Sequence, residues 1–104
     1  MELRVKSFPE LSNSELYEIL RVRSQVFVVE QECAYQDIDG KDRESNHLFL
    51  VDEDSILAYA RIFEDGDHYR IGRVLTTVRG KGYGSRVLRA SIEEIRKRSD
   101  KECI

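Results

Sequence analysis

The sequence predicts an α+β fold, in which a mainly antiparallel sheet of four strands is flanked by helices. Three observations support this fold class. Several short segments, one near the N-terminus and the others between residues 47 and 75, have the alternating or β-branched composition of strands. Two longer segments repeat apolar residues at helical spacing. A glycine-rich turn separates the last strand from the last helix, so the predicted order is strand, helix, loop, strand, strand, strand and helix.

A strand and a helix are expected first. The N-terminal residues alternate charged side chains with Leu3 and Val5, which predicts a strand with one buried face. Ser12 and Glu15 then match a capping box, in which a hydroxyl receives the first N–H groups of a helix and a glutamate reaches back to the cap. The helix is therefore expected over residues 13–24.

A long loop follows this helix. The apolar run 26–29 is expected to follow as a buried continuation, with its backbone geometry left open. Residues 31–46 then show almost no apolar periodicity. The Asp-rich stretch 37–42 does not fit a calcium loop, because Asp42 stands where an EF-hand needs glycine and Leu48 where it needs glutamate. We expect no metal. Two roles stay open for these carboxylates: an acidic pocket for an ammonium substrate, or capping of loop N–H groups.

Three antiparallel strands are expected next, over residues 47–51, 56–63 and 68–75. Asp65 and Gly66 between the second and third carry a hairpin signal. Gly72 lies in the interior of the third strand, where a glycine commonly marks a bulge or a close backbone approach.

The glycine-rich turn at residues 79–84 comes before a helix expected over residues 85–98. Glycines allow positive φ and close approach, and the first N–H groups of a helix have no intrahelical partner, so the turn suits an anion such as a pyrophosphate. A Walker loop and a dinucleotide fingerprint are excluded because their glycine spacing is absent. The helix carries an apolar stripe made of Val87, Leu88, Ser91, Ile92 and Ile95.

Composition fits one globular domain. The 104 residues are 40% hydrophobic and 36% charged, and no apolar run approaches the ~20 residues that span a membrane. Cys33 and Cys103 are too few for a disulfide framework, so we expect free thiols and a cytoplasmic location.

Charge is divided along the chain. Residues 30–54 hold nine acidic and two basic side chains, and residues 79–101 hold eight basic and three acidic ones. This division could serve a cationic substrate and an anionic cofactor, or it could form two ordinary solvated faces. The overall acidic charge and the lack of interleaved aromatic residues argue against nucleic-acid binding.

The sequence resembles the GNAT acyltransferases. Arg79, Gly82 and Gly84 match their acetyl-CoA signature, Arg/Gln-x-x-Gly-x-Gly/Ala, at the right spacing. Residues 26–42, together with 58–62 and 71–74, look like the ElaA-like branch of that family. The resemblance covers nearly all of the chain. It implies a three-layer α/β arrangement and a single N-acetyltransferase domain over residues 1–104.

By this resemblance the protein would transfer an acetyl group from acetyl-CoA to a small-molecule or peptidyl primary amine by direct attack. The strand edge would pair with the pantetheine arm, and the turn would hold the pyrophosphate. The implied cofactor-binding residues are Val74, Leu75, Thr76, Arg79, Gly80, Lys81, Gly82, Tyr83, Gly84 and Ser85.

Two side chains are candidates for the base that deprotonates the amine. Glu30 follows a buried apolar run, and partial desolvation would raise its pKa toward the range that a base needs. A salt bridge to Arg61 or Arg73 would instead lower that pKa. His47, at the start of a strand, is the alternative base.

The sequence departs from the family pattern in two places. The link at residues 75–78 is short and lacks the usual proline. A typical relative also continues past the helix at residues 85–98 with a strand, a helix and two more strands, which often supply the tyrosine that protonates the leaving thiolate. The resemblance therefore implies the N-terminal portion of the fold. An alternative function is a catalytically inactive half-domain that binds CoA or forms a homodimer through an exposed sheet edge.

Overall fold

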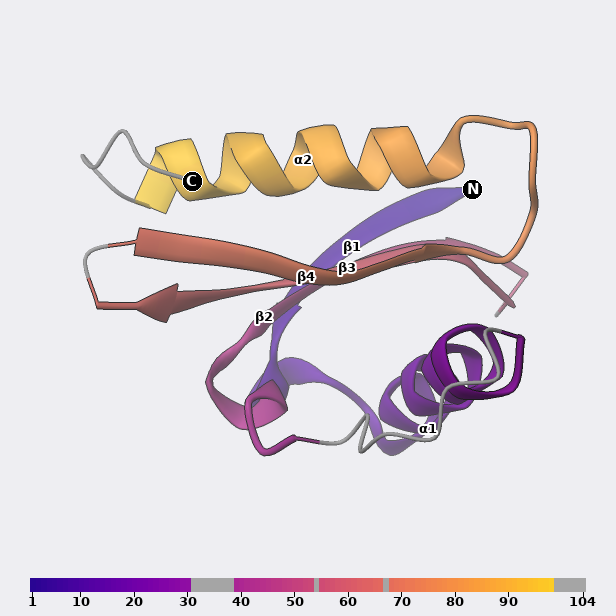
Figure 1. The fold of residues 1–104 in the computed structure, drawn as a ribbon, viewed down its shortest axis with the longest axis horizontal. Helices are drawn as coiled ribbons and strands as arrows, with labels where there is room; N and C mark the ends of the chain where they lie inside the picture. The colour runs from indigo at the N-terminus through magenta and orange to yellow at the C-terminus, as the bar shows by residue number, and fades with distance from the viewer. Residues whose placement is uncertain (31–38, 54, 67, 99–104) are drawn as a thin grey trace.

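A computed structural model describes residues 1–30, 39–53, 55–66 and 68–98. The main elements are β1 (Glu2–Ser7), α1 (Asn13–Arg23), β2 (Asn46–Asp52), β3 (Ser55–Asp65), β4 (His68–Thr76) and α2 (Tyr83–Arg98). The strands form one antiparallel sheet in the order β1-β2-β3-β4. Figure 1 shows three layers, with α2 on one face of the sheet and α1 on the other. The predicted fold class and element order are confirmed.

Two apolar cores explain why β2 and β3 are buried. On the α1 side the core is built from Ile19, Val22, Phe49, Val51, Ile56, Tyr59 and Leu75. On the α2 side it is built from Leu48, Leu50, Ala58, Ala60, Ile62, Val87 and Ile95. Because both faces of the central strands are covered, their apolar residues run continuously instead of alternating.

The prediction of a buried face on β1 is wrong. Leu3 and Val5 are 43% and 37% exposed, because β1 is an edge strand and α2 packs mainly against β3 and β4. The other face of β1 is joined to α1 by ion pairs. Arg4 and Lys6 reach Glu15 of α1 at 3.0 and 2.8 Å.

Helix α1 begins as the capping box predicts, since the N–H of Glu15 donates to Ser12 Oγ and the N–H of Ser12 donates to Glu15 Oε1. It passes into a π-helical segment, Ser24–Glu30, which the sequence did not indicate. The prediction that residues 26–29 are buried is correct only in part. Val26 and Phe27 pack against the core, whereas Val29 is 59% exposed.

In α2 the predicted stripe is mostly correct. Val87, Ser91 and Ile95 are buried, and the Ser91 hydroxyl donates to the Val87 carbonyl at 2.9 Å. Leu88 is 39% exposed, because it lies beyond the edge of the stripe that meets the sheet.

A bulge interrupts the pairing of β3 and β4. Gly72 stands opposite Arg61 and Leu75 opposite Tyr59, so two β4 residues face the single residue Ala60. Arg73, the first of them, has φ of 54°, a left-handed conformation that is rare outside glycine. The bulge expected from Gly72 is therefore present directly after it.

Candidate active site

The loop between β4 and α2 has the backbone that the sequence predicts. Gly80 and Gly82 have φ of 80° and 74°, in the left-handed region that favours glycine. A Cβ built at either glycine would meet no described atom within 4 Å. The backbone of this loop is thus open to an approaching group on the side where side chains would stand.

Two threonines fix the loop to the sheet. The Thr77 N–H and hydroxyl donate to the carbonyls of Leu57 and Ile56, at 2.9 and 2.8 Å. The Thr76 hydroxyl lies 2.9 Å from the Val78 carbonyl and 3.1 Å from the Leu57 carbonyl. These bonds hold a short link that has no proline, and sequence reasoning missed them. The signal in the sequence was a pair of adjacent threonines between a strand and a glycine turn, where hydroxyl groups can bond backbone carbonyls.

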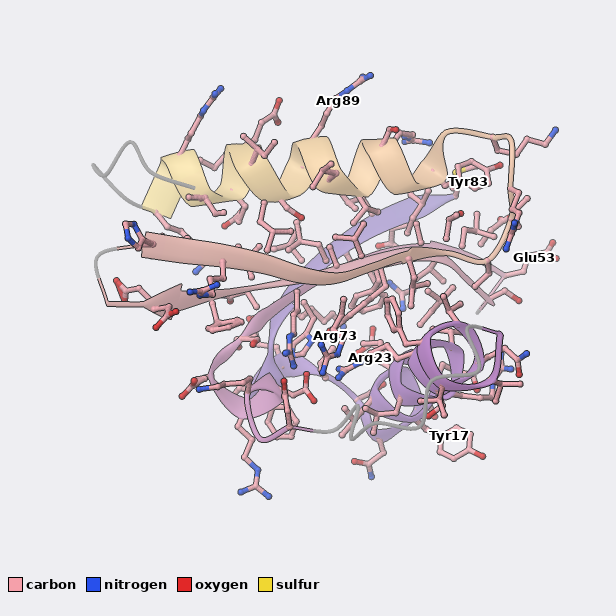
Figure 2. All side chains as sticks on the ribbon, in the orientation of Figure 1. Tyr17, Arg23, Glu53, Arg73, Tyr83 and Arg89 are labelled. Atoms are coloured by element: carbon pink, nitrogen blue, oxygen red, sulfur yellow. The ribbon has the colours of Figure 1, made fainter. Side chains whose placement is uncertain are left out.

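The start of α2 is electropositive. Its first turn follows Lys81 and contains Tyr83, Gly84, Ser85 and Arg86, and the Arg86 N–H bonds the Gly82 carbonyl at 3.1 Å. Lys81 and Arg86 are exposed. Figure 2 shows Tyr83 beside the loop and Arg89 pointing away from the sheet. Unbonded N–H groups and nearby cations together favour an anion at a helix N-terminus.

Strand β4 is an edge of the described sheet. Val74 is 38% exposed, whereas the Leu75 side chain is buried in the core on the α1 side. The outer edge of this strand can therefore accept an extended amide chain by backbone pairing, as a further strand would. Val74 lies in the bulge, where the regular pairing with β3 is interrupted.

A chain of ion pairs, buried at Asp42 and partly exposed at Asp39, lies between the sheet and α1. Asp42 accepts hydrogen bonds from Arg23 at 2.6 Å and from Arg61 at 3.0 Å. Asp39 accepts from Arg61 at 2.6 Å and from Arg73 at 3.3 Å. Figure 2 places Arg23 and Arg73 in this layer. The hydrogen bond from Arg61 holds the pKa of the Asp39 carboxyl well below its usual range.

These contacts argue against an open acidic pocket at Asp39 and Asp42, and they show the capping role at Asp39 alone. Asp39 also accepts the backbone N–H of Lys41 at 3.0 Å, which is turn chemistry. The arginine partners neutralise both carboxylates, so neither forms an open acidic pocket. The arginine partners were not predicted, because the pairs join residues 19 to 34 positions apart. Asp37 lies outside the described residues.

His47 is completely buried and held at both ring nitrogens. Nε2 lies 3.0 Å from the Asp42 carbonyl, which can only accept, so Nε2 carries the proton. Nδ1 then accepts the hydroxyl of Tyr59 at 2.6 Å. Burial lowers the pKa of His47, which keeps the ring neutral. This placement does not suit a base that must reach a substrate.

Glu30, the other candidate base, ends the π-helical segment after α1. Its side chain lies outside what the structure describes, so its role stays a prediction. In the described ranges, no group of three or more His, Cys, Asp or Glu could hold a metal ion.

Comparison with known proteins identifies the family. A sequence profile of the acetyltransferase (GNAT) family matches residues 10–104, which is most of the chain. The chain belongs to the GNAT acetyltransferase family. The same profile spans the glycine loop, the bulged β4 and the ion-pair layer described above.

Relatives of this GNAT chain include ElaA. Protein ElaA of Escherichia coli (strain K12) is 42% identical over 91 residues, which cover 81% of this chain and 60% of that protein. UPF0039 protein sll0451 of Synechocystis sp. is 40% identical over 93 residues, covering 84% of this chain and 60% of that protein. The resemblance to ElaA drawn from the sequence is confirmed.

Solved structures agree with this assignment. The crystal structure of Escherichia coli ElaA matches with a TM-score of 0.92 at 38% identity, over 97% of this chain and 74% of that one. An acyl-CoA N-acyltransferase from Pseudomonas aeruginosa matches with a TM-score of 0.88 at 32% identity, over 92% and 70%.

The chain spans about 60% of the length of the curated relatives it matches. None of the helices in the described part of this GNAT chain has the length and apolar composition needed to cross a bilayer.

Proposed function

We propose that this GNAT chain is an acetyl-CoA-dependent N-acetyltransferase that acts on a primary amine by direct attack. The glycine loop is the observation that carries the proposal. Two left-handed glycines open the backbone between the outer edge of β4 and the N-terminus of α2. The space that Gly80 and Gly82 leave free fits a phosphate that approaches the backbone closely.

The chain offers three groups of contacts to the cofactor. The backbone N–H groups of residues 80–85 bind the pyrophosphate, and the exposed Lys81 and Arg86 add positive charge. The outer edge of β4 at residues 74–76 pairs with the amides of the pantetheine arm. A backbone N–H of the bulge, at Val74 or Leu75, polarises the thioester oxygen.

Acetyl-CoA supplies the acetyl group. The amine nitrogen forms a C–N bond to the acetyl carbon, and the C–S bond breaks with its electron pair left on sulfur. The proton lost by the amine ends on that sulfur. The attacking amine must be neutral, so a base or a chain of water molecules takes up its proton. Glu30 is the base we propose, since His47 is buried. The cytoplasmic location and the single domain over residues 1–104 remain predictions.

Titration calorimetry with acetyl-CoA tests the proposal. Gly82→Ala should weaken binding by at least about tenfold, because a methyl group enters the phosphate site. Gly66→Ala is the matched control: Gly66 has φ of 64°, and its Cβ would also meet no described atom within 4 Å. Both variants carry similar backbone strain, but only Gly82→Ala should affect acetyl-CoA. No heat with the unaltered chain, or equal loss in both variants, would contradict the proposal.

A further inference from the structure

Gly72 is the starting point, because nothing in the described fold requires a glycine there. Its φ is not left-handed, and a Cβ at this position would meet no described atom within 4 Å. A glycine inside a strand costs stability and packs nothing. The absence of a side chain at Gly72 leaves open space above this part of the strand.

That space is a hollow of about 440 Å³ on the β3–β4 hairpin. Its described lining consists of Arg61, Phe63, Tyr69, Arg70, Ile71 and Gly72. Gly72 lies opposite Arg61, and Arg70 lies opposite Phe63. The missing side chain at Gly72 therefore opens room beside an aromatic ring and two guanidinium groups.

The hollow is next to the chemistry proposed above. It occupies residues 69–72 of β4, the bulge follows at 73–74, and the proposed pantetheine edge follows at 74–76. Gly72 directly precedes the bulge in sequence, so an amine in the hollow lies next to the strand positions proposed to hold the thioester.

Three cationic side chains lie around the hollow. The Arg61 guanidinium and the Lys41 ammonium lie 5.5 and 5.9 Å from the centroid of the Phe63 ring, and Arg70 is the register partner of Phe63 on β4. The described residues that line the hollow include no carboxylate. Arg61 is paired with Asp39 and Asp42, and Lys41 with Glu44. A substrate anion therefore needs a cation whose carboxylate partner can be exchanged.

Arg70 is the cation best able to bind a substrate anion. It is paired with Asp65, but both side chains are largely exposed, at 64% and 49%. Exposed pairs of this kind contribute little stability, so Arg70 can exchange Asp65 for another carboxylate at small cost. Arg61, by contrast, is buried and held by Asp39 and Asp42.

The geometry points to an acceptor that is a small primary amine carrying a carboxylate, with its body against Phe63 and its carboxylate on Arg70. This inference rests on the proposed function for the reaction, but it can be tested by binding alone. It excludes polyamines and other polycationic acceptors as preferred substrates.

Three matched probes test it: 4-(aminomethyl)benzoate, benzylamine and 1,4-bis(aminomethyl)benzene. Their dissociation constants are measured by NMR titration without acetyl-CoA, and their acetylation rates with it. The carboxylate probe should bind about threefold to fivefold more tightly than benzylamine, as an exposed ion pair allows, and the diamine most weakly. Arg70→Gln should remove this advantage and leave benzylamine unchanged. Arg98→Gln, an exposed arginine paired with Glu94 on α2, is the control.

A second variant probes the hollow itself. A Cβ at Gly72 meets no described atom within 4 Å, and the methyl groups of Gly72→Val would extend into the hollow. This variant should weaken all three amines without changing the acetyl-CoA dissociation constant. Tightest binding of the diamine, equal binding of the three probes, no binding of any, or no effect of Arg70→Gln would overturn the inference. If acetyl-CoA binds but the three amines do not follow the expected order of affinity, only this inference is overturned. If the amines follow that order but acetyl-CoA does not bind, only the proposed function is overturned.

Discussion

At the scale of single residues, Glu15 does two jobs that the sequence shows only in part. Its capping role was predicted from Ser12, three residues earlier. Its ion pairs with Arg4 and Lys6 were not, because they depend on how α1 packs against β1. These hydrogen bonds outweigh the effect of burial, which alone would raise the pKa of Glu15, and lower it to about 2.

This lowered pKa predicts a dependence of stability on pH. Because the folded pKa lies below the usual value of 4.5, the stabilisation is complete above that value and is lost as pH falls toward about 2. Glu15→Gln should therefore lower the free energy of unfolding at pH 7 by about 1 to 3 kcal/mol and flatten its slope between pH 5 and pH 2. Urea unfolding at several pH values measures both.

The control for this experiment is Glu18→Gln on the same helix. Glu18 pairs with the exposed Arg21, so its removal should change the free energy of unfolding by less than about 1 kcal/mol. An identical pH slope in the unaltered chain and in Glu15→Gln would show that the Glu15 contacts do not persist in solution.

At the scale of elements, β1 to β4, α1 and α2 were predictable because each carries its own periodicity and its own boundary residues. The π-helical segment Ser24–Glu30 was not predicted. The glycines of the loop were also readable, since positive φ demands them at Gly80 and Gly82. The predicted burial of Leu3, Val5 and Leu88 was wrong. Their exposure depends on which neighbouring elements cover the edge strand and the helix face, and local sequence does not show this. The Arg23–Asp42 ion pair could not be predicted either, because it depends on how distant segments of the chain pack together.

The unit formed by β4, the loop and α2 should depend on the threonine hydroxyls. Thr77→Val keeps the side-chain shape but removes the donor to the Ile56 carbonyl. We expect a loss of about 1 kcal/mol in stability and faster amide hydrogen exchange over residues 78–82. Thr77→Ser, which keeps the hydroxyl, should exchange as the unaltered chain does. Unchanged exchange in Thr77→Val would mean that the hydroxyl does not hold the loop.

At the scale of the whole molecule, the two faces of the sheet differ in composition. The α2 face is an apolar core, whereas the α1 face combines a core with the layer of ion pairs around Asp39 and Asp42. The proposed cofactor loop and the hollow over Gly72 lie at opposite ends of β4. One strand can therefore align an acyl donor and an acceptor. Pairing of a second copy along the outer edge of β4 remains a prediction from the sequence.

The most direct test of the central proposal is to titrate acetyl-CoA into the isotope-labelled chain and follow its backbone amide signals by NMR. The largest shifts are expected at residues 79–85 and 74–76, with α1 and the turn at Gly66 almost unaffected. Shifts that are absent at millimolar acetyl-CoA, or that centre on another part of the sheet, would contradict the proposal.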